Sequence, residues 1–129
     1  MPATRRERCG GGDGGSTTVE VAVLLPLMIL LLMVVVQVGI WFHTRAVMVT
    51  AANKGVDAAR LEDGTAAEGR TVTEDFLRHA GALRDDTIDV DRGAETASVT
   101  VSGRVVSLLF GVPLDITATA EAPVEQVTP

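Results

Sequence analysis

Few side chains in this 129-residue chain have the types and spacing that catalysis or metal binding requires. The two histidines, His43 and His79, lie far apart in the sequence, and neither belongs to a plausible set of metal ligands. The carboxylates that could bind a cation lie in one short segment: Asp85, Asp86, Asp89 and Asp91. They match no calcium-loop pattern, and such carboxylates more often form a solvated face. We therefore predict no catalytic residues, no metal site and no cofactor.

The single cysteine and the glycine-rich segment beside it have equally ordinary interpretations. Cys9 cannot form an internal disulfide, and it precedes the apolar run, whereas a lipoprotein cysteine would follow one. The glycines between Cys9 and Ser16 follow no strand and include no lysine, so they do not form a phosphate-binding loop. The net charge of −6 argues against a nucleic-acid partner that binds through a basic surface.

The apolar residues are concentrated in one segment, residues 21–42, which has 22 residues and no charge. As a helix it would be about 33 Å long, enough to span a hydrocarbon core of about 30 Å. The segment from His43 to Pro129 contains 8 Lys/Arg and 14 Asp/Glu, so it carries the net charge. We therefore predict a single-pass membrane protein, with the lipid bilayer as its first partner and an acidic head on one side.

The basic residues beside the span predict its orientation. Arg5, Arg6 and Arg8 lie upstream, whereas only Arg45 lies close on the downstream side. The positive-inside rule then places the N-terminus in the cytoplasm and the C-terminal head outside. The alternative is a cleaved secretory signal, but the apolar stretch is longer than the 7–15 residues typical of such signals.

One charge, Glu20, lies at the start of the apolar run. The glycine-rich segment disfavours a helix, whereas Ser16 and the threonines after it are good N-cap residues, so we predict that the helix begins near Ser16. A carboxylate in the first turn complements the helix dipole and is tolerated at a membrane interface. This interpretation gives Glu20 no role beyond an interfacial charge.

The spacing supports a second interpretation. A basic leader, Gly15, Glu20 and an uninterrupted apolar helix resemble a type IV prepilin signal, in which a membrane peptidase cleaves after the glycine. The resemblance implies cleavage between Gly15 and Ser16, which makes Glu20 the fifth residue of the mature chain. It also implies that Glu20 sets the register between helices by pairing with the free amine of a neighbouring subunit, because an unpaired carboxylate in an apolar helix is costly.

The segment from Ser16 to Arg60 further resembles the TadE-like proteins of tight-adherence (Flp) pilus systems. The matching features are Glu20, Ala22, Pro26, Gly39, the Ala51–Ala52 pair and the segment 55–60, GVDAAR. Val21 departs from the family, which usually has an aromatic residue there. Pro26 lacks an N–H group, so we predict a kink in the transmembrane helix.

Three other residues of the span have weaker implications. Gly39 has no small residue four positions away, so it forms no GxxxG motif. Gln37 could donate a hydrogen bond to another helix or lie solvated at the outer end of the span. Trp41 lies where a tryptophan anchor at the outer interface is expected.

The remaining pattern predicts an α+β fold with three parts: a cytoplasmic leader over residues 1–15, a long helix over 16–60 and a small extracytoplasmic head over 61–129. The stripe that would face the head has helical spacing: Phe42, Ala46, Val49, Ala52, Val56 and Ala59. The alternative is a membrane anchor joined to a separate helix.

The head is predicted to contain one helix and about three antiparallel strands. Thr71 and Glu74 have the spacing of a capping box, which predicts a helix from Thr71 or Thr73 to about Leu83. Alternating apolar residues then predict strands over 88–91, 97–105 and 114–122, with a turn at 92–93 and a loop at 110–113.

Two functions follow, from different classes of protein. The resemblance implies a non-enzymatic TadE-like minor pilin or pseudopilin, with prepilin peptidase, other pilin or TadE/TadF-like subunits and the pilus secretion machinery as partners. The alternative is a generic single-pass membrane-anchored module of the cell envelope that binds or senses a ligand. The N-terminus of the mature protein would distinguish them.

Overall fold

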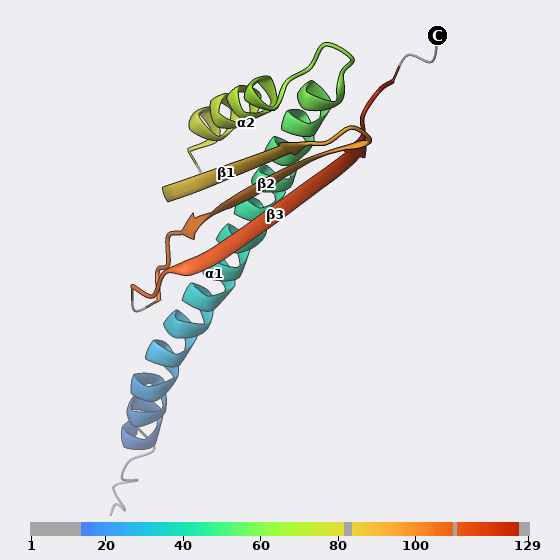
Figure 1. Ribbon diagram of the computed structural model, residues 1–129. Coiled ribbons are helices and arrows are strands. Elements are labelled where there is room, and N and C mark those ends of the chain that lie inside the picture. The colour runs from blue at the N-terminus through green and yellow to red at the C-terminus, as the bar shows by residue number, and fades with distance from the viewer. Residues whose placement is uncertain (1–13, 82–83, 110, 127–129) are drawn as a thin grey trace, which may run out of the picture.

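A computed structural model describes residues 14–81, 84–109 and 111–126, and it gives only the backbone of Gly14, Ser16 and Arg84. Two helices precede three strands, in the order α1, α2, β1, β2, β3 (Figure 1). The predicted α+β class, with a long apolar helix and a head of one helix and three antiparallel strands, is confirmed. Arg5, Arg6, Arg8 and Cys9 of the predicted leader lie outside the described residues.

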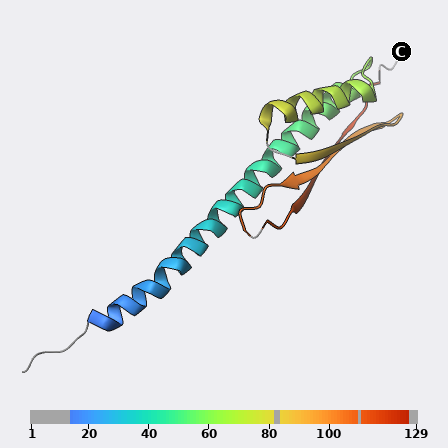
Figure 2. The same cartoon turned by 90° about the vertical axis from the view of Figure 1, so that its left-hand side faces the viewer.

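Helix α1 (Gly14–Arg60) has 47 residues and is therefore about 70 Å long. It is one continuous helix rather than an anchor joined to a separate helix. It begins two residues before the predicted start at Ser16. Once a helix has formed, each added residue contributes one more hydrogen bond. A glycine makes the helix less stable than an alanine would by only about 1 kcal/mol. The N-terminal half of α1 projects away from the head, whereas the C-terminal half packs against it (Figure 2).

The head bonds the carbonyl groups at the C-terminal end of α1. Arg92 donates through Nε to the Ala59 carbonyl at 2.6 Å and through Nη2 to the Leu61 carbonyl at 3.1 Å. The N–H of Glu125 donates to the Arg60 carbonyl at 2.9 Å. A guanidinium also complements the negative end of the helix dipole. These contacts end the helix at the predicted residue, Arg60.

Helix α2 (Ala66–Ala80) begins earlier than predicted, and the capping box expected at Thr71 and Glu74 is wrong. The N-cap is Thr65, whose hydroxyl oxygen accepts a hydrogen bond from the Glu68 N–H at 3.1 Å. The Glu68 carboxylate accepts one from the Thr65 N–H, also at 3.1 Å. Both Thr-x-x-Glu pairs fit the motif. The earlier start gives α2 more than one additional turn to pack against α1.

The end of α2 also differs from the prediction. Gly81 does not lie inside the helix; it is the C-cap, in a left-handed conformation with φ of 59° that glycine adopts without strain. Its N–H donates to the Leu77 carbonyl at 3.0 Å. The expected end of the helix, Leu83, lies outside the described residues.

The sheet contains β1 (Arg84–Arg92), β2 (Thr96–Val105) and β3 (Leu114–Pro123), all antiparallel, in the order β1-β2-β3. The predicted turn after Arg92 is closed by a hydrogen bond of 2.8 Å from the Gly93 N–H to the Thr96 carbonyl. The predicted alternation in β2 and β3 is confirmed, because the inward-facing side chains are buried: Ala97, Val99, Val101, Val105, Ile116, Ala118 and Ala120.

The core lies between the sheet and the C-terminal half of α1, with α2 packed beside β1 (Figures 1 and 2). The predicted stripe on α1 is only half correct, since Phe42, Ala46 and Val49 are exposed. The buried face of α1 is rotated from it and contains Gln37, Thr44, Met48, Ala51, Ala52, Gly55, Val56 and Ala59. Two of these side chains are polar, and so they did not mark a core face in the sequence.

Candidate membrane and assembly site

The N-terminal half of α1 is an apolar surface without a partner in the monomer. Every residue from Val21 to Val36 is exposed. The helix is long and apolar enough to cross a membrane, with a mean hydropathy of 2.9 in an 18-residue window of which nothing is buried. A monomeric soluble protein rarely exposes so large an apolar surface. The feature is therefore that of a membrane anchor or of a helix that packs against other helices.

The residues predicted to act in processing and pairing lie at the N-terminal end of this surface. Gly15 and Ser16 lie in the first turn of α1, and among the described residues no atom outside the adjacent helix backbone lies within 4 Å of the position of a Cβ atom at Gly15. Helix ends fray readily, so this turn can unwind into the extended form that a protease requires. Glu20 is exposed, and it forms no ion pair with any residue that the structure describes. Cleavage at Gly15 and pairing by Glu20 stay predictions.

Pro26 lies inside α1, which continues on both sides of it. The side chains around Pro26 are exposed, so no contact from the head supports the helix here. The kink predicted at this residue stays a prediction.

Gln37 has a role that neither sequence interpretation anticipated. Its side chain is 7% exposed and is bonded to the loop between β2 and β3. The amide Nε2 donates to the Val106 carbonyl at 3.4 Å, and the Leu108 N–H donates to Oε1 at 2.7 Å. The sequence indicated that Gln37 is unusual, because it is a single amide within 22 apolar residues. It did not reveal that the hydrogen-bond partner of Gln37 belongs to the same chain. The contact between the head and α1 therefore ends at Gln37. Beyond Gln37, toward the N-terminus, lies the exposed apolar half of the helix.

Aromatic residues lie just beyond Gln37. Trp41 is partly buried, and its ring packs edge-on against Phe42 with centroids 5.1 Å apart. The Arg45 guanidinium lies 5.6 Å from the centre of the Trp41 ring, within the range of a cation–π interaction. A tryptophan with a cation on its outer side is typical of the boundary between hydrocarbon and water.

We expect replacement of Gln37 by leucine to release the β2–β3 loop. The change leaves the partly buried Leu108 N–H without its acceptor, and the net loss of one such hydrogen bond is about 1 kcal/mol. Hydrogen exchange at Leu108 should then accelerate roughly 5-fold. Gln126→Leu is the matched control, since Gln126 donates to the Ala94 carbonyl at 2.6 Å, far from this loop. Equal exchange at Leu108 in both variants would show that Gln37 does not fix the loop.

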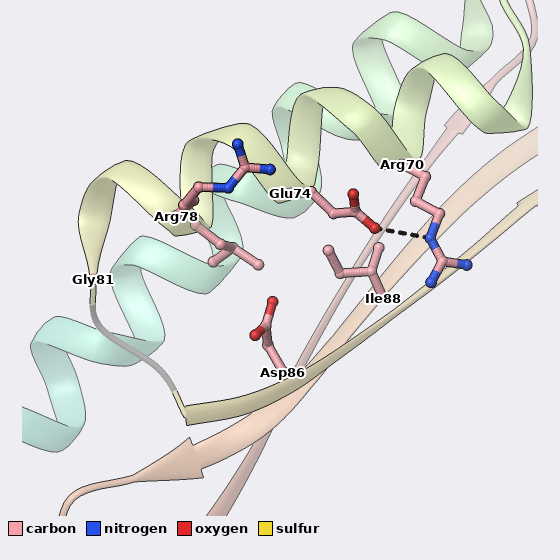
Figure 3. Close-up of a pocket in the computed structure, with 7 residues that line it drawn as sticks. Arg70, Glu74, Arg78, Gly81, Asp86 and Ile88 are labelled. Atoms are coloured by element: carbon pink, nitrogen blue, oxygen red, sulfur yellow. Dashed lines mark hydrogen bonds and ion pairs between the residues drawn. The ribbon is translucent and has the colours of Figure 1, made fainter.

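The head has an open pocket between α2 and β1, with a volume of about 420 Å³ (Figure 3). It is lined by Arg70, Glu74, Leu77, Arg78, Gly81, Asp86 and Ile88. Arg70 and Glu74, both on α2, already pair along one wall of the pocket at 3.0 Å, so each charge has a partner within the head. The lining offers no nucleophile with an adjacent base, and we assign no chemistry to this pocket.

The side chains considered for metal binding do not converge. His43 is exposed on α1, His79 is exposed near the end of α2, and Asp85 pairs with Arg104 at 3.7 Å. Within residues 14–81, 84–109 and 111–126, no group of three or more His, Cys, Asp or Glu side chains could hold a metal ion.

A long apolar helix whose C-terminal half carries a small α+β head is consistent with a pilin-like protein and suggests a membrane anchor. Residues 15–57 match the family model of TadE-like proteins. This match confirms the resemblance predicted from the sequence, and it covers the exposed half of α1 and most of the half that packs against the head. No curated protein and no solved structure matches the chain.

Proposed function

We propose that this protein is a TadE-like minor pilin or pseudopilin that acts, without enzymatic turnover, in the assembly of a tight-adherence pilus. The observation that carries the proposal is the match to TadE-like proteins over residues 15–57, a segment that lies within α1 and includes its exposed apolar half. The family supports a pilus-related role, and the helix supports a membrane anchor. Other pilin or TadE/TadF-like subunits and the secretion machinery are the proposed partners.

The proposed topology places α1 across the cell membrane, with the N-terminus in the cytoplasm and the head outside. The support is the excess of arginine upstream of the span, where Arg5, Arg6 and Arg8 lie, over the single Arg45 close on the downstream side. In this arrangement the exposed apolar residues of α1 contact lipid before assembly. They contact the helices of neighbouring subunits afterwards, either in the filament or in a membrane-bound assembly complex.

We further propose that prepilin peptidase removes the leader by cleaving between Gly15 and Ser16. Co-expression of the full chain with this peptidase, followed by mass spectrometry, should give a chain that begins at Ser16. Replacement of Gly15 by leucine should block cleavage, because a branched side chain then stands at the scissile bond. Gly14→Ala is the matched control and should be processed like the natural chain.

An intact leader after co-expression would reject the processing site and favour the alternative, a membrane-anchored binding or sensing module. Cleavage of both the natural chain and the Gly15→Leu variant at another bond would also reject it. Neither result would decide whether α1 spans the membrane. Quenching of a tryptophan at position 30 by brominated lipid measures that separately.

A further inference from the structure

We propose that the β2–β3 loop inserts the exposed side chains of Val106, Leu108 and Val112 into the outer interfacial layer of the bilayer that α1 spans. The head would then have a second membrane contact besides its helix. The inference rests on the membrane-spanning role proposed for α1, and it concerns a part of the chain outside the family match.

The part of α1 that the head leaves uncovered is too short to span the hydrocarbon core alone. The exposed apolar run that the head leaves uncovered, Val21 to Val36, has 16 residues and is about 24 Å long. A hydrocarbon core of about 30 Å requires about 20 residues of helix. Glu20 fixes the lower limit, because its carboxylate belongs at the cytoplasmic interface. The upper boundary of the hydrocarbon therefore lies near Ile40, beyond Gln37.

The β2–β3 loop lies close to this upper boundary of the hydrocarbon. Gln37 bonds the loop at Val106 and Leu108, so these two residues lie at the level of Gln37. The loop is the part of the head nearest the apolar half of α1, and the β1–β2 turn lies at the opposite end of the sheet (Figure 1). Unless the bilayer thins, the loop must contact its outer interface.

The loop has the apolar, uncharged composition that a membrane interface favours. Residues 105–114 include no charged side chain, and Val106, Leu108 and Val112 are 49%, 46% and 55% exposed. Some of the backbone is bonded within the loop, since the Leu109 carbonyl accepts the Ser107 hydroxyl at 2.9 Å and the Val112 N–H at 3.4 Å. Such bonding lowers the cost of moving the backbone out of water.

The far end of the head has the opposite composition. Glu62 and Asp63 are exposed in the connection between α1 and α2, and Glu95 is exposed in the β1–β2 turn. Leu61, in the same region, is 50% exposed. The β2–β3 loop itself is therefore apolar and uncharged, and the exposed charges nearest to it, on Arg104, Asp85 and Asp115, pair with one another behind it. The far end of the head is acidic, as expected if the bilayer covers the loop and water surrounds the far end.

The proposal can be tested by placing a single tryptophan at three leucines of similar exposure. In a Trp41→Phe background, Leu30→Trp, Leu108→Trp and Leu61→Trp report the middle of the span, the loop and the far end of the head; the natural leucines are 49%, 46% and 50% exposed. Each full-length variant is reconstituted into phosphatidylcholine vesicles that contain lipid brominated either near the headgroup or deep in the acyl chains.

We expect the emission of the Leu108→Trp variant to be shifted to the blue and to lose roughly half its intensity with the shallow bromines, since interfacial residues lie about 5–10 Å into the headgroup and acyl boundary. Emission from position 30 should be quenched most by the deep bromines, and emission from position 61 by neither. Val112→Trp is a second reporter of the loop and should behave like Leu108→Trp.

If position 30 is quenched but positions 108 and 112 behave like position 61, the loop does not touch lipid and this inference fails, while the membrane-spanning role stands. If position 30 is not quenched, that role fails and the inference fails with it. Blue-shifted emission at position 108 that bromines do not quench, and that reverses on dilution with lipid, would identify a second copy of the chain as the occupant and would also overturn it.

Discussion

Replacement of Gly55 by alanine should destabilise the head more than the same replacement at Gly39 of α1. A Cβ atom at this position would collide with the Thr73 hydroxyl, and it would lie 3.0 Å from the Gly69 carbonyl oxygen and 3.3 Å from a Val99 methyl group. Two of these three neighbours belong to α2. Gly55 is therefore the point of closest approach between α1 and α2.

The neighbours of Gly55 cannot move aside at low cost. The Thr73 side chain is fully buried, and its hydroxyl donates to the Gly69 carbonyl at 2.8 Å. Gly69 is itself confined, because a Cβ atom there would lie 2.8 Å from the Gly55 carbonyl oxygen. Overpacking of this kind costs about 1–3 kcal/mol. The better helix propensity of alanine offsets only about 1 kcal/mol of that cost.

The measurement is thermal unfolding of the full-length chain in detergent, followed by circular dichroism. We expect the Tm of Gly55→Ala to fall by roughly 4–8 °C, since the net cost is about 1 kcal/mol and 1 kcal/mol corresponds to about 4–8 °C in a domain of this size. Gly39→Ala is the matched control on the same helix, because no group lies within 4 Å of its Cβ position. A Tm for Gly55→Ala equal to that of Gly39→Ala would refute the close approach.

The strands could be predicted from the sequence because their physical signal is local. One face of β2 and β3 is buried and the other is solvated, so apolar and polar residues alternate along each strand. Val99 and Val101 are buried, as the pattern predicted. The exposed apolar half of α1 could be predicted for a similar reason, since 22 consecutive uncharged residues are long and apolar enough for a membrane-spanning helix.

The faces of the two helices could not be predicted as well. The N-terminal half of α1 is apolar on every side, so helical spacing there selects several stripes equally. The face that packs against the head is distinguished by Gln37 and Thr44, which are buried polar residues. On α2 the buried residues include Gly69 and Thr73, whereas the larger apolar Val72 is exposed. Close helix packing favours small residues, which a search for large apolar side chains overlooks.

The processing site at Gly15 and Ser16 was predicted from the resemblance to prepilin signals and not from a physical property of these residues. Within the described residues, Glu20 is simply an exposed carboxylate on an apolar helix. What it does depends on neighbouring subunits and on a new N-terminus, neither of which a single unprocessed chain contains. Its role is therefore a question for an assembly experiment.

Replacement of Glu20 by alanine should leave membrane insertion intact and abolish assembly with other pilin subunits. Insertion should survive because the change removes a charge from an apolar helix. Assembly should fail because packed helices exclude water from the carboxylate, which then requires a cationic partner. If the leader is cleaved, the free amine at Ser16 of a neighbouring subunit is the partner that the resemblance to pilins implies.

The size of the effect follows from what remains when the carboxylate is removed. Loss of one member of a buried ion pair leaves the other charge buried and unpaired, at a cost of about 3–5 kcal/mol, or at least about 100-fold in affinity. Glu20→Gln should fail similarly, because the amide retains the shape but not the charge. Glu62→Ala removes an exposed carboxylate at the far end of the head and should assemble normally. Co-purification with the partner pilins from membranes measures the outcome, and normal assembly of Glu20→Ala would show that the carboxylate is only an interfacial charge.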